Sequence, residues 1–147
     1  MRGTSLVARR DVPGFLKALT AKLLGTWLSR LLVLLLLAAS LVGVLTGCYS
    51  CIANVAEIVL AFFAYAYVHE VAQFLFIDSD VEVAYEDGAL TLRAVGEPRW
   101  PRLAVACGIV APGVLGAAAL GSFPAFGLVV LLLTLITLLR YLADEVE

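Results

Sequence analysis

Residues 31–56 read LLVLLLLAASLVGVLTGCYSCIANVA and contain no charged side chain. A helix of about 20 apolar residues crosses the roughly 30 Å hydrocarbon core of a bilayer. The stretch is too long for one such helix, and Gly47-Cys48-Tyr49-Ser50-Cys51 interrupts it with residues typical of a tight turn. We therefore expect a first membrane span at about 31–47 and the start of a second span at about residue 52.

Further apolar segments extend this pattern to the end of the chain. The second span continues to about residue 77, and two more are expected at about 103–120 and 124–141. The segment from Asp78 to Arg102 is polar, and Gly121-Ser122-Phe123-Pro124 indicates a turn. The fold class that this predicts is an all-α transmembrane protein, with residues 31–147 forming a four-helix membrane bundle.

The composition of the 147 residues supports a membrane location. Hydrophobic residues make up 63% of the chain and charged residues 15%, with a mean hydropathy of +1.02. A soluble domain of this size could not bury so much apolar side chain. The net charge of −2, with no basic stripe, excludes a nucleic-acid partner and leaves the lipid bilayer as the expected partner.

The basic residues indicate how the chain is oriented, because cytoplasmic loops are enriched in Lys and Arg. Nine of the ten basic residues lie before the first span or between the second and third: Arg2, Arg9, Arg10, Lys17, Lys22, Arg30, Arg93, Arg99 and Arg102. The two short turns hold none. We therefore expect a multi-pass protein of the cell membrane with cytoplasmic N- and C-termini.

Residues 1–30 form the expected cytoplasmic N-terminal segment. Phe15, Leu19, Leu23 and Trp27 recur every fourth residue, after a helix start at Asp11 and Pro13. This spacing is typical of an amphipathic helix that lies in the membrane interface and leads into the first span. One long bent helix that begins near Phe15 is the alternative.

Only the loop between the second and third spans has a strand period. Val81, Val83 and Tyr85 alternate with polar or small residues, and Leu90, Leu92 and Ala94 follow with the same period. Glu86-Asp87-Gly88 between them is a hairpin turn signal. We expect a short cytoplasmic β-hairpin at about 80–95.

The second span carries ionisable residues that are candidates for chemistry. The sequence His69-Glu70-Val71-Ala72-Gln73 has the spacing of the His-Glu-x-x-His zinc motif, with Gln73 at the second histidine position. His69 and Gln73 share a helix face and are the candidate metal ligands, and Glu70 is the candidate catalytic residue. Zinc is the cofactor that this spacing indicates.

This arrangement resembles the site-two protease family of intramembrane zinc metalloproteases. The motif lies toward the cytoplasmic end of its span, the hairpin follows it, and Ala106-Cys107-Gly108-Ile109-Val110-Ala111-Pro112-Gly113-Val114-Leu115-Gly116 is similar to the family's small-residue helix. The resemblance covers about residues 60–140. It implies that His69 is the first zinc ligand and Glu70 the acid/base.

Two departures from the family predict that the chain is not an active peptidase. Gln73 replaces the second ligand, and residues 126–139 contain no acidic residue to supply the third. His69 and Glu70 could instead be solvated at the membrane surface or pair with arginines of the following loop. The alternative function is a small non-catalytic accessory subunit of a larger membrane complex.

Small residues in the third span predict a helix-packing surface. They are Gly108, Pro112, Gly113 and Gly116. Such residues allow helix backbones to approach closely in lipid, either within the bundle or against another membrane subunit.

Cys48 and Cys51 form the other motif, in the turn expected at the outer surface. A C-x-x-C pair there is compatible with a structural disulfide, with two reduced thiols or with a redox pair. A second alternative function is therefore a thiol-disulfide redox membrane protein.

Overall fold

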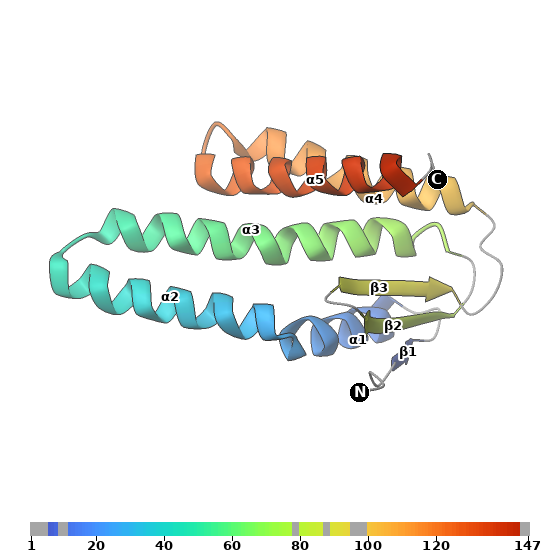
Figure 1. Cartoon of the computed structure of the whole chain (residues 1–147), viewed down its shortest axis with the longest axis horizontal. Coiled ribbons are helices and arrows are strands. Elements are labelled where there is room, and N and C mark those ends of the chain that lie inside the picture. The colour runs from blue at the N-terminus through green and yellow to red at the C-terminus, as the bar shows by residue number, and fades with distance from the viewer. Residues whose placement is uncertain (1–5, 9–11, 78–79, 87–88, 95–99, 145–147) are drawn as a thin grey trace.

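The computed structural model describes residues 6–8, 12–77, 80–86, 89–94 and 100–144. Five helices and three strands are found in these residues. In chain order they are β1 (Leu6–Ala8), α1 (Val12–Gly25), α2 (Trp27–Thr46), α3 (Tyr49–Phe74), β2 (Val81–Glu86), β3 (Ala89–Ala94), α4 (Pro101–Ala119) and α5 (Pro124–Asp144). Figure 1 shows the long helices side by side, with the strands gathered near one end of the molecule.

The helices α2, α3, α4 and α5 are long and apolar enough to cross a membrane. They expose large apolar side chains over their outer surfaces, as lipid requires. The sequence-based prediction of a multi-pass membrane protein is confirmed at this level. Its membrane and the side on which the termini lie stay predictions.

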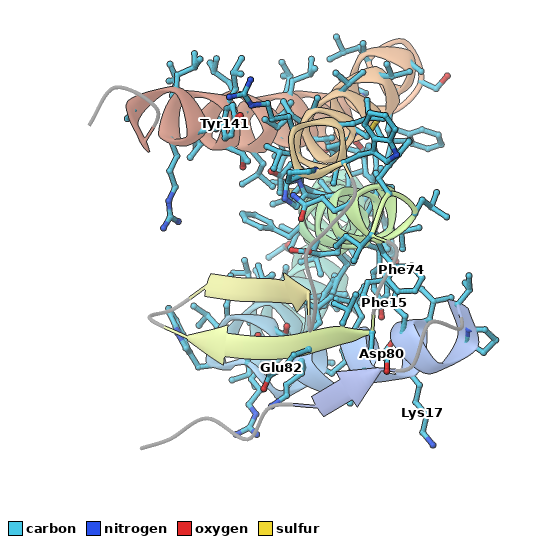
Figure 2. All side chains as sticks on the ribbon, turned by 90° about the vertical axis from the view of Figure 1, so that its right-hand side faces the viewer. Phe15, Lys17, Phe74, Asp80, Glu82 and Tyr141 are labelled. Carbon is cyan, nitrogen blue, oxygen red and sulfur yellow. A yellow bond between two sulfur atoms is a disulfide. The ribbon has the colours of Figure 1, made fainter. Side chains whose placement is uncertain are left out.

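α3 is the central helix of the bundle and contacts α2 on one side and both α4 and α5 on the other (Figures 1 and 2). The helix ends differ by a few residues from the expected spans. α2 begins at Trp27 rather than residue 31, and α3 ends at Phe74 rather than residue 77. The last three residues of the expected second span form a tight turn, in which Ile77 N donates to Phe74 O at 3.1 Å.

A break at Thr26 separates α1 from α2. Thr26 has extended backbone angles, φ −71° and ψ 149°, and its side-chain oxygen accepts a hydrogen bond from Ser29 N at 3.1 Å. This is the geometry of a helix N-cap, which satisfies an otherwise free donor at the start of α2. The chain therefore forms two helices here instead of one long bent helix. The position of α1 relative to the membrane interface stays a prediction.

α1 packs against the end of α3 and the sheet. Phe15 and Leu19 are fully buried in a cluster with Phe74, and the rings of Phe15 and Phe74 stack at 4.1 Å between centroids. Figure 2 shows these two rings between α1 and α3, whereas Lys17 points away from α3. Of the expected apolar stripe, Phe15 and Leu19 therefore face the protein, while Trp27 belongs to α2 and is 64% exposed.

The strands form a three-stranded antiparallel sheet in the order β1-β2-β3. β2 pairs with β3 in the register Val83↔Leu92, and β1 pairs with the other edge of β2 in the register Leu6↔Val83. The hairpin expected at 80–95 corresponds to β2 and β3, and β1 is a third strand that the sequence pattern did not predict. The expected turn at 87–88 and the end of the hairpin at residue 95 lie outside the described residues.

The sheet completes the buried cluster at the end of α3. Val81 and Val83, on one face of β2, are fully buried there with Phe15 and Phe74. A two-stranded hairpin alone is marginally stable, so a third strand and packing on α1 supply the support that it lacks. β1 and α1 are consequently joined to the rest of the chain by strand pairing and by helix packing.

The substitution Phe15→Ala tests this packing. Removing a fully buried aromatic ring lowers the free energy of unfolding by about 3–5 kcal/mol, and α1 should become accessible to protease. Thermal unfolding and limited proteolysis of the protein in detergent measure both effects. Leu24→Ala is the matched control, because Leu24 is on the same helix and is 54% exposed, so its effect should stay within about 0.5 kcal/mol. Equal losses in the two variants would contradict the packing.

Candidate functional site

His69 and Gln73, the candidate metal ligands, lie in the last two turns of α3 and are bonded to each other. His69 Nδ1 donates a hydrogen bond to the carbonyl oxygen of Gly108 on α4, at 2.6 Å. His69 Nε2 lies 3.0 Å from Gln73 Nε2. A carbonyl only accepts, so Nδ1 carries the proton, and the neutral ring then accepts from the Gln73 amide at Nε2. Nδ1 thus joins α3 to α4, whereas the contact of Nε2 with Gln73 lies within α3.

Gly108 makes this contact possible because it has no side chain. A Cβ atom placed on Gly108 would lie 2.7 Å from Gln73 Cγ and 2.8 Å from Gln73 Nε2. These distances are too short for non-bonded atoms. Only glycine at position 108 therefore allows the Gln73 side chain to lie against α4 there. We call the hydrogen-bonded set of His69, Gln73 and Gly108 the α3–α4 lock.

The residues of the α3–α4 lock do not fit a zinc site. A histidine binds zinc through an unprotonated ring nitrogen, and the unprotonated nitrogen of His69 faces the amide nitrogen of Gln73. Within the described ranges, no three His, Cys, Asp or Glu side chains gather where they could hold a metal ion. In this structure Gln73 donates a hydrogen bond to His69, and its role as a metal ligand stays a prediction.

Glu70, the candidate catalytic residue, is only 6% exposed. It follows His69 in the helix and so points about 100° away from it around the axis. Among the residues that the structure describes, none donates a hydrogen bond to the Glu70 carboxyl group. An ionised carboxylate buried without a partner costs several kcal/mol. A hydrolytic role for Glu70 stays a prediction.

Two more polar contacts tie α3 to α5, and the sequence pattern did not indicate their partners. The Tyr65 hydroxyl hydrogen-bonds Thr137 Oγ1, and the Tyr65 ring stacks on the His69 ring at 5.5 Å. Nearer the start of α3, Glu57 Oε2 accepts a hydrogen bond from Phe126 N at 3.2 Å. Phe126 lies in the first turn of α5, so Glu57 neutralises the positive end of that helix dipole.

The small residues of α4 lie where the helices cross. Gly108, Pro112 and Gly116 are buried, and Gly113 is half-buried. Gly116 faces α5 so closely that a Cβ atom on Gly127 would lie 2.8 Å from the Gly116 carbonyl oxygen. These residues allow α4 to approach both α3 and α5, the packing that small residues permit in lipid.

An apolar groove opens between α3, α4 and α5 at the end opposite the sheet. Its volume is about 720 Å³, and its lining consists of Ala53, Ala56, Glu57, Leu60, Leu115, Ala118, Ala119, Ser122, Phe123 and Phe126. Four of these ten residues are alanines, and Glu57 is the one ionisable residue among them. No sequence pattern indicates this groove, because alanines are common throughout apolar helices.

A disulfide bond joins Cys48 to Cys51 in the turn between α2 and α3. Cys48 is the N-cap residue of α3, and Cys51 lies in the first turn of that helix. The third cysteine, Cys107, is free and half-buried in α4. The pair is therefore separate from the α3–α4 lock, which lies toward the opposite end of α3.

The substitution Gly108→Ala tests the α3–α4 lock. The added methyl group should displace Gln73 from His69 and lower the free energy of unfolding by about 1–3 kcal/mol. Gly113→Ala on the same helix is the control, because its Cβ would meet Thr134 Cγ2 at an ordinary 3.4 Å. Thermal unfolding measures stability, and the nitrogen NMR shifts of the single histidine report the hydrogen bonds. Unchanged histidine shifts in Gly108→Ala would show that Gln73 does not depend on Gly108.

Comparisons with protein-family models, with curated proteins and with solved structures find no match for this chain. The α3–α4 lock and the groove are consequently the features on which a functional assignment can be based.

Proposed function

We propose that this protein is a non-catalytic accessory subunit of the membrane, which binds a transmembrane helix of another protein and does not hydrolyse peptides. The observation that carries this proposal is the contact between His69 Nε2 and the Gln73 amide nitrogen, because Nε2 is the ring nitrogen that would otherwise be free to bind a metal. A hydrolytic metal needs a free histidine nitrogen and further ligands. The α3–α4 lock instead joins two helices through the hydrogen bond from His69 to Gly108.

We further propose that the chain is a degenerate relative of the site-two proteases. The order of elements supports this kinship: a helix with His69-Glu70-x-x-Gln73, then paired strands, then a Gly- and Pro-containing helix. Exchange of a ligand histidine for Gln73 would have converted a metal site into a helix contact. A protein of this kind keeps the ability to receive a polypeptide in the membrane without the ability to cut it.

The groove between α3, α4 and α5 is the surface that suits a partner helix. Its alanines allow close approach of a helix backbone, which is the basis of helix association in lipid. The lipid-facing surfaces of α2 and α5, by contrast, expose leucines such as Leu41 at 63% and Leu128 at 62%. Acyl chains pack equally well on leucine, so they do not account for an alanine-lined groove.

Glu57 favours a helix over a lipid chain as the occupant of the groove. Its carboxylate lies about eight residues from the start of α3, or ~12 Å along the helix, within the apolar layer. One carboxylate oxygen accepts from Phe126 N, and the other is available to a donor that enters the groove. An acyl chain offers no donor at that depth, whereas a helix with a hydroxyl or basic side chain does.

Metal analysis tests the non-catalytic part of the proposal. Protein purified from membranes without chelators should contain far less than one zinc ion per chain, and His69→Ala should contain the same amount. The physical reason is that the histidine lone pair is already occupied by Gln73. Elemental analysis by mass spectrometry provides the measurement. Stoichiometric zinc that disappears in His69→Ala would contradict the proposal.

Site-specific photocrosslinking tests the partner. A photoreactive residue at Ala118, in the groove, should give one discrete protein adduct in native membranes, and the adduct peptide should be a transmembrane helix. Ala53→Phe fills the groove and should abolish that adduct. A photoreactive residue at Leu41, on the lipid-facing surface of α2, is the control and should react with lipid alone. Lipid adducts alone at Ala118, or an adduct with a second copy of this chain, would contradict the proposal.

A further inference from the structure

The Cys48–Cys51 disulfide lies at the exposed tip of the α2–α3 hairpin, which Figure 1 shows at the end of the molecule away from the sheet. Cys51 is exposed and Cys48 is half-buried. Their neighbours Tyr49, at 69%, and Ser50 are also exposed, so most of the turn is open to solvent. A thiol group of another molecule can therefore reach the disulfide directly.

The turn also has backbone hydrogen bonds of its own, besides the disulfide. Gly47 takes the left-handed conformation, with φ 71°, that ends α2, and its N–H donates to Val44 O. Tyr49 N donates to Gly47 O, and Cys51 N donates to Cys48 O at 3.1 Å. Closing a loop between residues three apart also restricts the unfolded chain less than closing a long loop. A structural role accounts poorly for this bond.

The two sulfur atoms have different surroundings, which gives the bond a preferred direction of cleavage. Cys48 is at the N-terminus of α3, where free backbone N–H groups and the helix dipole stabilise negative charge. Ser50 Oγ lies 3.7 Å from Cys48 Sγ and can donate a hydrogen bond to it. Cys51 is the more exposed of the two. An attacking thiolate therefore meets Cys51 first and leaves Cys48 as the stabilised thiolate.

We propose that Cys48–Cys51 is an exchange-active disulfide that oxidises a dithiol of another polypeptide at the membrane surface. The incoming thiolate forms a bond to Cys51 Sγ, the Cys48–Cys51 bond breaks, and its electron pair goes to Cys48 Sγ. The second thiol of the partner, once deprotonated, attacks the partner's sulfur in the mixed disulfide and releases Cys51 as a thiolate. The partner dithiol is oxidised to a disulfide, Cys48 and Cys51 are reduced, and the number of electrons balances at two.

This activity is independent of the α3–α4 lock and of the groove. The disulfide and the α3–α4 lock lie at opposite ends of α3, because Cys51 is in its first turn and Gln73 in its last. Loss of partner binding in the groove would leave exchange at the turn unchanged. The two proposals can therefore fail separately.

Reduction by glutathione tests the proposal on the full chain in detergent. Cys107→Ala removes the free thiol, so that only Cys48 and Cys51 are counted by a mass-tagged maleimide. With excess reduced glutathione the pair should become reduced within about an hour in the folded protein. A disulfide that stays oxidised in folded protein, but is reduced after unfolding in detergent, would overturn the proposal.

Two further measurements separate exchange activity from a merely exposed structural bond. Ser50→Ala should slow reduction by about threefold, because it removes a hydrogen bond to the leaving sulfur, while the melting temperature stays the same. Mass spectrometry of acid-quenched samples should find glutathione on Cys51 rather than on Cys48. A clear fall in melting temperature on reduction would assign the bond a structural role and overturn the proposal. Glutathione on Cys48 would overturn the direction of cleavage.

Discussion

A polar group inside an apolar layer must find its partner within the protein, because no water is present to supply one. α3 carries polar side chains along most of its length, and this requirement decides how its neighbours are arranged. Glu57 accepts a hydrogen bond from the first turn of α5, and Tyr65 hydrogen-bonds Thr137 of the same helix. His69 donates a hydrogen bond to the Gly108 carbonyl oxygen of α4. Hydrophobic burial cannot select a unique packing among helices surrounded by lipid, since lipid tails are as apolar as leucine. These three contacts fix the register of α4 and α5 on α3.

At the end of the molecule that holds α1 and the sheet, hydrophobic burial rather than polar contact determines the packing. There, Phe15, Phe74 and Val83 are buried together as in a soluble protein, and charged residues such as Lys17 point outward (Figure 2). A strand carries free backbone donors and acceptors at its edge, so a small sheet of this kind belongs outside the hydrocarbon layer. The chain thus combines a lipid-facing bundle, selected by polar contacts, with a small core of ordinary hydrophobic packing. The Phe15–Phe74 stack joins the two.

The sequence predicts those features that depend on segment length and local pattern. It does not predict which side chain or backbone atom a polar residue will contact. Long apolar runs are enough to place four apolar helices to within a few residues. The spacing of His69 and Gln73 places them on one face, but nothing in that spacing indicates that the amide nitrogen rather than the oxygen of Gln73 meets the ring. Strand β1, of three residues, is too short to show a period. Gly108 was expected as a packing residue, yet its carbonyl oxygen, a backbone atom without a sequence signature, is what His69 binds.

Glu57 and Glu70 differ in whether the protein supplies a hydrogen-bond donor for the carboxyl group. Both are carboxylates on α3, but Glu57 is matched by the N-terminus of α5, while Glu70 is 6% exposed and accepts no hydrogen bond from the described residues. The α3–α4 lock needs only His69, Gln73 and Gly108, so Glu70 is not explained by helix packing. A buried carboxyl group without a partner is among the most costly features of a membrane helix. An apolar side chain at this position would therefore make the folded chain more stable.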